Sequence, residues 1–329
     1  MKRKNVGKEI IDVSFPTHDV MKEPYKKYSS GVQAYDELTD GIPTGILTVD
    51  AGNTMSGKTI LNIQKCFSIL KEAHENYAIY IDTEGTAKIS LYNWKERFEK
   101  RFGIKVGIIE PKLINDEESG FEWIVVKPNI EKNIVLITVR DLFRLYEMHG
   151  TPISLKISDK GKIDVIRKPL TKKHNEELYI EDIPLGRLLS KKLEPCVMVY
   201  DSIIELIKQR IPAYRENFPV RSSLLHMLLG FMQRFAEYFD IPVIGITHTS
   251  IDPVTNQETV AALNTISYNC KLITLIKAPY TMEEKRHIRK IMLYRHPYKP
   301  PLEKVMYMKL TSEGFVDVPE EELKKFGLG

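Results

Sequence analysis

An eight-residue stretch from Gly52 to Thr59, GNTMSGKT, has the residue types and the spacing of a phosphate-binding loop. It matches the pattern G-x-x-x-x-G-K-[ST] and stands between the apolar run GILTV and a segment with helical spacing. The two glycines permit backbone angles and a close approach that a side chain would obstruct. Main-chain N–H groups can therefore point at a phosphate. The pattern predicts a nucleotide-binding site formed by Gly52, Asn53, Thr54, Met55, Ser56, Gly57, Lys58 and Thr59.

The lysine and the threonine that end this loop have defined roles in phosphate chemistry. Lys58 would place its ammonium on the β- and γ-phosphates, and the Thr59 hydroxyl would be a ligand of Mg²⁺. A magnesium–nucleotide site also requires a carboxylate at the end of a neighbouring buried strand, and Asp201 follows the run CVMVY. The alternative is that Asp201 only caps the following helix. Because the loop is present upstream, we favour metal binding by Thr59 and Asp201.

Hydrolysis of a bound nucleotide requires, in addition, a group that orients the attacking water. The stretch AIYIDTEGT places Asp82 and Glu84 at the end of a second strand, on the edge of the sheet where open α/β folds bind ligands. Glu84 could accept a proton from a water aligned on the γ-phosphate. From the residues alone, a solvated carboxylate or a helix cap is an equal alternative.

Alternating strands and helices must position these residues. Apolar runs typical of buried strands occur at residues 45–51, 76–84, 121–128, 195–202 and 241–250, and helical spacing occurs after Lys58 and at 91–102, 139–150 and 222–239. Continuous apolar strands that alternate with helices predict an α/β fold with a mostly parallel central sheet and helices on both faces. Residues 153–168 have the period-two pattern of a β-hairpin, and residues 286–318 that of antiparallel strands.

Composition and charge exclude several classes of protein. The 329-residue chain is 43% hydrophobic and 28% charged, which argues against extended disorder, and its net charge of +4 neither requires nor excludes a polyanionic partner. Three scattered cysteines in apolar stretches are typical of reduced thiols and have no metal-binding spacing. No apolar run is long enough to span a bilayer, and no signal peptide follows the basic start. We therefore expect a cytoplasmic protein without membrane association.

Several stretches of the chain resemble the ATPase core of RadA-type recombinases, the archaeal members of the RecA family. The similarity covers most of residues 29–104 and 195–318. Its most specific parts are the phosphate loop and DTEGT, and it continues in VYDS, YRENFPVRSSLLHML, IPVIGITHTS and MKLTSEGFVDV. The resemblance implies a RecA-like P-loop NTPase core over residues 31–329, an N-terminal arm over residues 1–30, and an insertion within about residues 105–194. It also implies ATP and Mg²⁺ as cofactors, with Glu84 and Lys58 as the catalytic residues.

Two departures from the family pattern lie near the expected nucleotide. The family has an arginine that stacks on the adenine where this chain has Lys88, and a lysine lacks the planar guanidinium for stacking. The family also ends the IGIT strand with Asn-Gln, which senses the γ-phosphate, where this chain has His248 and Thr249. Either can still hydrogen-bond a phosphate oxygen. We keep Lys88 and Thr249 as candidate nucleotide-binding residues. The alternative for Thr249 is that it only ends a strand and does not contact the nucleotide.

Binding of single-stranded DNA is implied by the same resemblance. The first DNA-binding loop would contain Arg215 and Arg221, whereas the second, residues 250–265, has two acidic residues and no lysine or arginine, a poor match to a phosphate backbone. The predicted hairpin region, residues 152–173, carries seven basic residues against two acidic ones, with Lys160 and Lys162 among them. Three interpretations of this basic ribbon stay open: it binds along a nucleic-acid backbone, it docks on a protein partner such as a recombinase, or it is only the solvent-exposed face of a hairpin.

Assembly into a filament or a ring is a further implication of the resemblance. Phe15, in SFPTHDV, stands where the family has an aromatic anchor that docks on the neighbouring subunit, and folding back onto its own core is the equal alternative. Near the end of the chain, Arg286, Arg289 and Arg295 are candidates to reach a neighbour's γ-phosphate.

The resulting hypothesis is a Mg-ATP-binding, DNA-stimulated ATPase of the RecA/RadA superfamily that acts in homologous recombination or DNA repair. A divergent paralogue fits the departures better than the main strand-exchange protein. Two alternatives stay open. One is a recombination mediator that uses ATP as a switch with little turnover, and the other is a ring-forming helicase or signalling ATPase on the same core.

Overall fold

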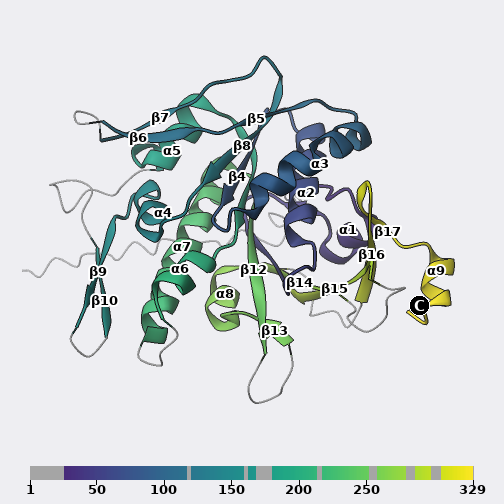
Figure 1. Ribbon diagram of the computed structural model, residues 1–329. Helices are drawn as coiled ribbons and strands as arrows, with labels where there is room; N and C mark the ends of the chain where they lie inside the picture. Colours follow the sequence, from purple (N-terminus) through teal and green to yellow (C-terminus); the bar gives the residue numbers. More distant parts are fainter. Residues whose placement is uncertain are drawn as a thin grey trace, which may run out of the picture.

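A single large sheet organises the molecule (Figure 1). The computed structural model describes residues 26–116, 120–158, 162–167, 180–212, 217–251, 258–278, 286–297 and 305–328. Within these residues the sheet has eleven strands, in the order β17-β16-β15-β14-β3-β12-β11-β4-β8-β5, with β13 paired to β12.

Seven neighbouring strands of this sheet are parallel. They are β3 (Leu47–Gly52), β4 (Tyr77–Asp82), β5 (Val106–Ile109), β8 (Lys132–Thr138), β11 (Pro195–Asp201), β12 (Val243–Ile251) and β14 (Leu272–Lys277). Because all seven run the same way, their carboxyl ends lie along one edge of the sheet, where the loops after β3, β4, β11 and β12 meet. The predicted mostly parallel α/β sheet is confirmed.

Antiparallel strands complete the sheet on one side. They are β15 (Ile288–Arg295), β16 (Val305–Thr311) and β17 (Gly314–Asp317), and they agree with the antiparallel pattern of residues 286–318. The short β13 (Glu258–Val260) folds back on the end of β12. The parallel and antiparallel parts are joined by β14, which pairs with β3 on one side and β15 on the other.

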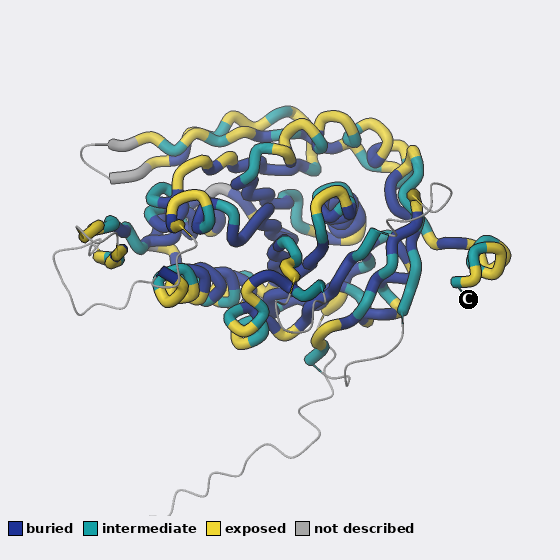
Figure 2. Tube along the Cα trace, turned by 60° about the horizontal axis from the view of Figure 1, so that its bottom comes forward, coloured by how far each residue is buried: buried dark blue, intermediate teal, exposed yellow. Residues whose placement is uncertain are grey.

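Helices cover both faces of the sheet, since successive side chains of each central strand enter opposite cores. In β4, Ile79 and Ile81 belong to one core, and Ala78 and Tyr80 to the other. On the second face lie α1 (Gln33–Thr39), α2 (Lys58–Glu72) and α3 (Thr86–Phe102). On the first lie α4 (Leu142–Met148), α5 (Pro184–Lys192), α6 (Glu205–Arg210), α7 (Phe218–Phe239) and α8 (Leu263–Asn269). Figure 2 shows the buried strands between these two helical layers.

Two hairpins lie outside the central sheet. The first joins β6 (Lys112–Asp116) to β7 (Gly120–Ile124). The second joins β9 (Ile153–Ile157) to β10 (Ile163–Arg167), the predicted hairpin, and extends away from the sheet (Figure 1). The run 121–128 therefore does form a strand, but one that stops at Ile124 and, among the described strands, pairs with β6 outside the central sheet. Two strands from the range 105–194, β5 and β8, belong to the central sheet.

The remaining elements are peripheral. The small β1 (Lys27–Tyr28) pairs with β2 (Ile42–Pro43), a 3-10 turn spans Ile180–Asp182, and α9 (Glu320–Lys325) lies near the end of the chain. Over the described ranges, no helix combines the length and the apolar character that crossing a bilayer requires.

Candidate nucleotide site at the carboxyl edge of the sheet

The loop between β3 and α2 has the close contacts that demand glycine. A Cβ on Gly52 would lie 2.5 Å from the carbonyl oxygen of Ile276, on the neighbouring β14. Gly57 has φ of 90°, and a Cβ there would lie 2.6 Å from the Phe315 ring. Both positions thus hold the backbone in a shape that side chains would prevent. Helix α2 begins at Lys58, directly after this turn.

Lys58 lies across the loop. Its side chain is buried, and Nζ donates to the carbonyl oxygens of Gly52 and Asn53, both at 2.8 Å. Burial lowers the pKa of this ammonium, while the negative charges of Asp201 and Glu84 oppose the shift. The ammonium is therefore held at the mouth of the loop, where an anionic ligand would stabilise its charge.

The loop also has polar atoms that are buried without a partner. Within the described part of the chain, the side-chain amide of Asn53 and the hydroxyl of Ser56 make no hydrogen bond. Buried polar groups are normally paired, so these atoms are available to a ligand that enters the loop. Two unpaired donors beside a lysine at a helix N-terminus fit a phosphate group. Thr54 and Met55 form the exposed outer part of the loop.

Thr59 and Asp201 meet at the base of the loop. The Thr59 hydroxyl donates to Asp201 Oδ2 at 2.7 Å, and the Tyr80 hydroxyl donates to the same oxygen at 2.9 Å. Burial raises the pKa of the Asp201 carboxyl to about 6, with a further contribution from the negative charge of Glu84. A buried carboxylate next to a hydroxyl is a donor set that fits Mg²⁺.

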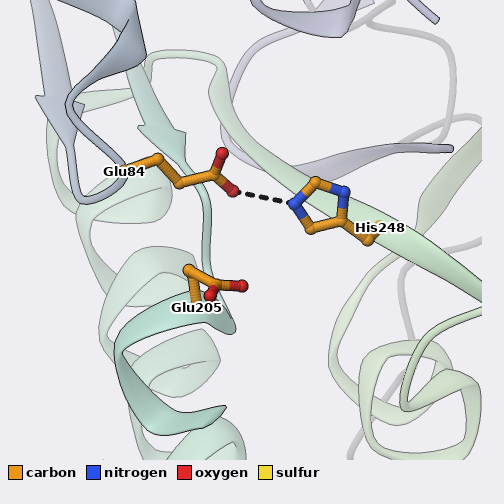
Figure 3. A group of neighbouring side chains, drawn as sticks. All are labelled: Glu84, Glu205 and His248. Carbon is orange, nitrogen blue, oxygen red and sulfur yellow. Dashed lines mark hydrogen bonds and ion pairs between the residues drawn. The ribbon is translucent and has the colours of Figure 1, made fainter. Parts of the chain in front are cut away.

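Two acidic residues after β4 have different surroundings. The Asp82 carboxylate accepts hydrogen bonds from the backbone N–H groups of Glu84, Gly85 and Lys88, so it is Asp82 that caps α3. Glu84 instead points toward β12, where its Oε1 lies 2.8 Å from His248 Nε2 (Figure 3). That hydrogen bond is the main cause of the lowered pKa of Glu84, and the Lys58 ammonium adds to it.

Consecutive residues of β12 point in different directions. His248 lies in register with Gly52 of β3 and faces Glu84. Thr249 donates from Oγ1 to Glu258 Oε1 in β13, at 2.5 Å. Of the two residues that follow the strand segment IGIT, His248 is therefore the one brought next to Glu84. The carboxylate of Glu205, the first residue of α6, lies in the same cluster (Figure 3).

Other predicted site residues lie apart from this cluster or outside the described residues. The Lys88 ammonium pairs with the carboxylate of Glu110 at 2.6 Å and is half exposed. The Arg221 guanidinium donates to the carbonyls of Ile211 and Lys208. Lys162 pairs with Asp164 on the outer hairpin. The candidates that lie outside the described residues are Phe15, Lys160 and Arg215.

Sequence reasoning did not identify one residue that supports the loop. Arg289 of β15 is buried, and its Nε donates to the carbonyl oxygen of Ser56 at 2.9 Å. Arg289 therefore contacts the phosphate loop of its own chain, a role that its place in the sequence had not suggested. The antiparallel return of β15 beside β14 brings it there. A basic residue at a buried position of an apolar strand was the only signal available.

A buried ionic network below the loop was also not predicted. Asp50 pairs with Lys65 at 2.5 Å, and both side chains are almost completely buried. Its carboxylate also accepts hydrogen bonds from Tyr35, Asn62 and Thr274. Burial opposes the charge of Asp50, but Lys65 and these hydrogen bonds outweigh it and lower the pKa of the carboxyl. The network ties β3 to α1, α2 and β14.

The sheet, the helices on both faces and the loop from β3 to α2 together define a RecA-like α/β fold. Among solved structures, the crystal structure of the RadB recombinase is similar, with a TM-score of 0.53. The similarity covers 89% of this chain and all of that chain, at 20% sequence identity, and therefore concerns the fold. No protein-family model matches the chain. The predicted fold class is thus confirmed.

Proposed function

We propose that this protein is a Mg-ATP-dependent ATPase of the RecA superfamily that acts in homologous recombination or DNA repair. The observation that carries the proposal is the convergence of three segments at one edge of the sheet: the start of α2 with Lys58 and Thr59, the end of β11 with Asp201, and the turn after β4 with Glu84. The RecA-like fold and the similarity to a recombinase structure support it.

The proposed reaction assigns a separate task to each side chain. The loop amides and the Lys58 ammonium bind the β- and γ-phosphates, and Thr59 and Asp201 would hold Mg²⁺. The metal ion would neutralise charge that develops on the phosphate oxygens. Glu84 takes a proton from water as the water oxygen bonds to the γ-phosphorus. The bond from that phosphorus to the bridging oxygen breaks, and ADP leaves with the electron pair.

DNA contact is proposed for the basic residues outside the ATP site. Arg221 is held by backbone carbonyls, which fixes its side chain at the start of α7. The β9–β10 hairpin carries Lys156, Lys162 and Arg167 on a two-stranded ribbon that extends from the molecule. A projecting basic ribbon can follow a phosphate backbone. We also propose that ATP binds between adjacent subunits of a filament or ring.

The decisive measurement is ATP hydrolysis with and without single-stranded DNA over a series of salt concentrations. We expect stimulation by DNA that disappears as salt rises, because released counterions contribute to binding. Glu84→Gln should reduce turnover by roughly 100-fold or more with ATP binding retained. Lys58→Ala should weaken ATP binding itself. Glu96→Gln, an exposed carboxylate on α3, is the matched control. Unchanged turnover in Glu84→Gln would refute the assignment of the base.

The contact between Glu84 and His248 favours one second candidate, an ATP-switched mediator with little turnover. A carboxylate that already accepts a hydrogen bond, and whose pKa is lowered by it, is a weaker base. Tight ATP binding, together with a turnover rate that neither DNA nor Glu84→Gln changes, would favour the mediator over the ATPase.

A further inference from the structure

Three metal-binding side chains come together beside the phosphate loop (Figure 3). Glu84 comes from the turn after β4, His248 from β12, and Glu205 from the start of α6. One oxygen of each carboxylate and one imidazole nitrogen all lie within 4.8 Å of one another. Ligand atoms around a tetrahedral zinc ion lie roughly 3.4 Å apart, so only small side-chain movements separate this cluster from a binding geometry.

The electrostatic surroundings of the cluster favour a cation. Two carboxylates flank one imidazole, and Asp201 lies near enough for Glu84 to raise its pKa. Lys58, whose ammonium acts on Glu84, is directed to the carbonyls of Gly52 and Asn53. In the described ranges, the Glu205 carboxylate accepts a single long hydrogen bond, from Gln209 at 3.3 Å. A cation would therefore gain the Glu205 carboxylate, which has little other compensation, together with the Glu84 carboxylate that otherwise pairs with His248.

The donor atoms select the type of metal. Mg²⁺ and Ca²⁺ prefer oxygen ligands, whereas an imidazole with carboxylates suits Zn²⁺ and similar late first-row ions. The three side chains are each partly exposed, at 22% for Glu84 and 23% for His248, so an ion can enter from solvent. The donor pair Thr59 and Asp201 is separate from this set and contains only oxygen.

We propose that Glu84, His248 and Glu205 form an inhibitory site for a late first-row divalent cation, with Zn²⁺ as the preferred ion. Binding would replace the hydrogen bond between His248 and Glu84 by bonds from both side chains to the metal. Glu84 would then no longer accept a proton from water, while the loop would still bind the nucleotide. This inhibitory consequence rests on the proposed ATPase function, but the metal site itself does not.

Calorimetric titration of the full chain with Zn²⁺, without nucleotide and with excess Mg²⁺, tests the site directly. We expect Glu205→Gln and His248→Asn each to weaken Zn²⁺ binding at least tenfold, while Glu96→Gln binds as the unmodified chain does. Circular dichroism checks that each variant is folded. Equal Zn²⁺ affinity in the unmodified chain and in both ligand variants would overturn the proposal, even if background zinc binding by other histidines is present.

The effect of Zn²⁺ on ATP hydrolysis tests the inhibitory role. Glu205 has no part in the proposed reaction, so Glu205→Gln should keep its turnover without zinc and lose at least tenfold in sensitivity to zinc. Nucleotide affinity should not change when zinc is added. A chain that binds Zn²⁺ through these residues but hydrolyses no ATP would contradict the proposed function alone. A chain that hydrolyses ATP with the same zinc sensitivity in Glu205→Gln would contradict the inhibitory site alone.

Discussion

The hydroxyl of Thr59 donates to the carboxylate of Asp201 at 2.7 Å, although 142 residues separate them in the chain. One residue begins α2 and the other ends β11, and the parallel strands place both at the same edge of the sheet. This contact brings together the two groups that would share the magnesium ion.

The neutral variant Asp201→Asn should separate function from stability. Burial raises the pKa of this carboxyl to about 6, so the stability that it contributes when protonated is lost as pH rises through that value. At pH 8 the asparagine variant should therefore be more stable by about 1–3 kcal/mol. It should also bind Mg-nucleotide at least tenfold more weakly. Chemical denaturation and nucleotide titration measure the two effects, and a clear loss of stability at pH 8 would contradict the raised pKa.

Magnesium-dependent nucleotide binding should weaken in acid. With a pKa of about 6, the Asp201 carboxyl is mostly protonated at pH 5, which leaves roughly one molecule in ten with the ionised ligand. We expect about a tenfold loss of Mg²⁺ affinity between pH 7.5 and 5. Because the nucleotide also titrates, Asp201→Asn serves as the reference. The same pH dependence in both proteins would show that Asp201 does not cause it.

Removal of the imidazole in His248→Ala should affect turnover and its pH profile. The hydrogen bond from His248 is the main cause of the lowered pKa of Glu84, so its loss should move the acid limb of turnover to higher pH. We expect turnover to fall about tenfold, with ATP affinity unchanged, because the base is less well oriented. Ser250→Ala, two residues along the same strand and exposed, is the control. If the acid limb of the pH–turnover profile does not move in His248→Ala, the hydrogen bond between His248 and Glu84 is absent from the enzyme during turnover.

Arg289→Ala should weaken nucleotide binding without a direct contact to the nucleotide. The side chain supports the loop through the Ser56 carbonyl, and hydrogen bonds from charged groups contribute about 1.5–3 kcal/mol. Roughly tenfold or greater loss of affinity follows. Tyr294→Ala, which changes an exposed residue of the same strand, should bind as the unmodified chain does. Equal affinities in the two variants would exclude this supporting role.

The buried pair of Asp50 and Lys65 predicts a strongly coupled double-mutant cycle. Asp50→Leu or Lys65→Met alone leaves an uncompensated buried charge, which costs about 3–5 kcal/mol of unfolding free energy. Removing both charges in Asp50→Leu with Lys65→Met should cost clearly less than the sum of the single changes. Denaturant unfolding of the four proteins gives the coupling energy. Additive effects would mean that the two charges do not stabilise each other.

Much of the fold and the centre of the site could be predicted because the information is local. A continuous apolar strand followed by a glycine-rich loop and a helix specifies β3, α2 and the environment of Lys58 within a few residues. The same pattern of apolar strand and terminal carboxylate located Glu84 and Asp201. The order of the strands in the sheet could not be predicted from such local patterns, because it depends on pairing between distant segments.

What could not be predicted depends on contacts between distant segments. The direction of Arg289 follows from the register of β15 against β14, which no local pattern encodes. The Lys88 ammonium pairs with Glu110, which lies beyond α3, and no local pattern encodes that contact. The run 121–128 is apolar enough for the central sheet, yet β6 is the strand that pairs with it.

Two residues much later in the sequence support the phosphate loop. Arg289 donates a hydrogen bond to the Ser56 carbonyl, and the Phe315 ring lies against Gly57. During synthesis, the eight residues of the motif are made more than two hundred residues before Phe315, the second of the supporting residues. A nascent chain would thus carry the complete motif before either of the residues that support its loop had been synthesised.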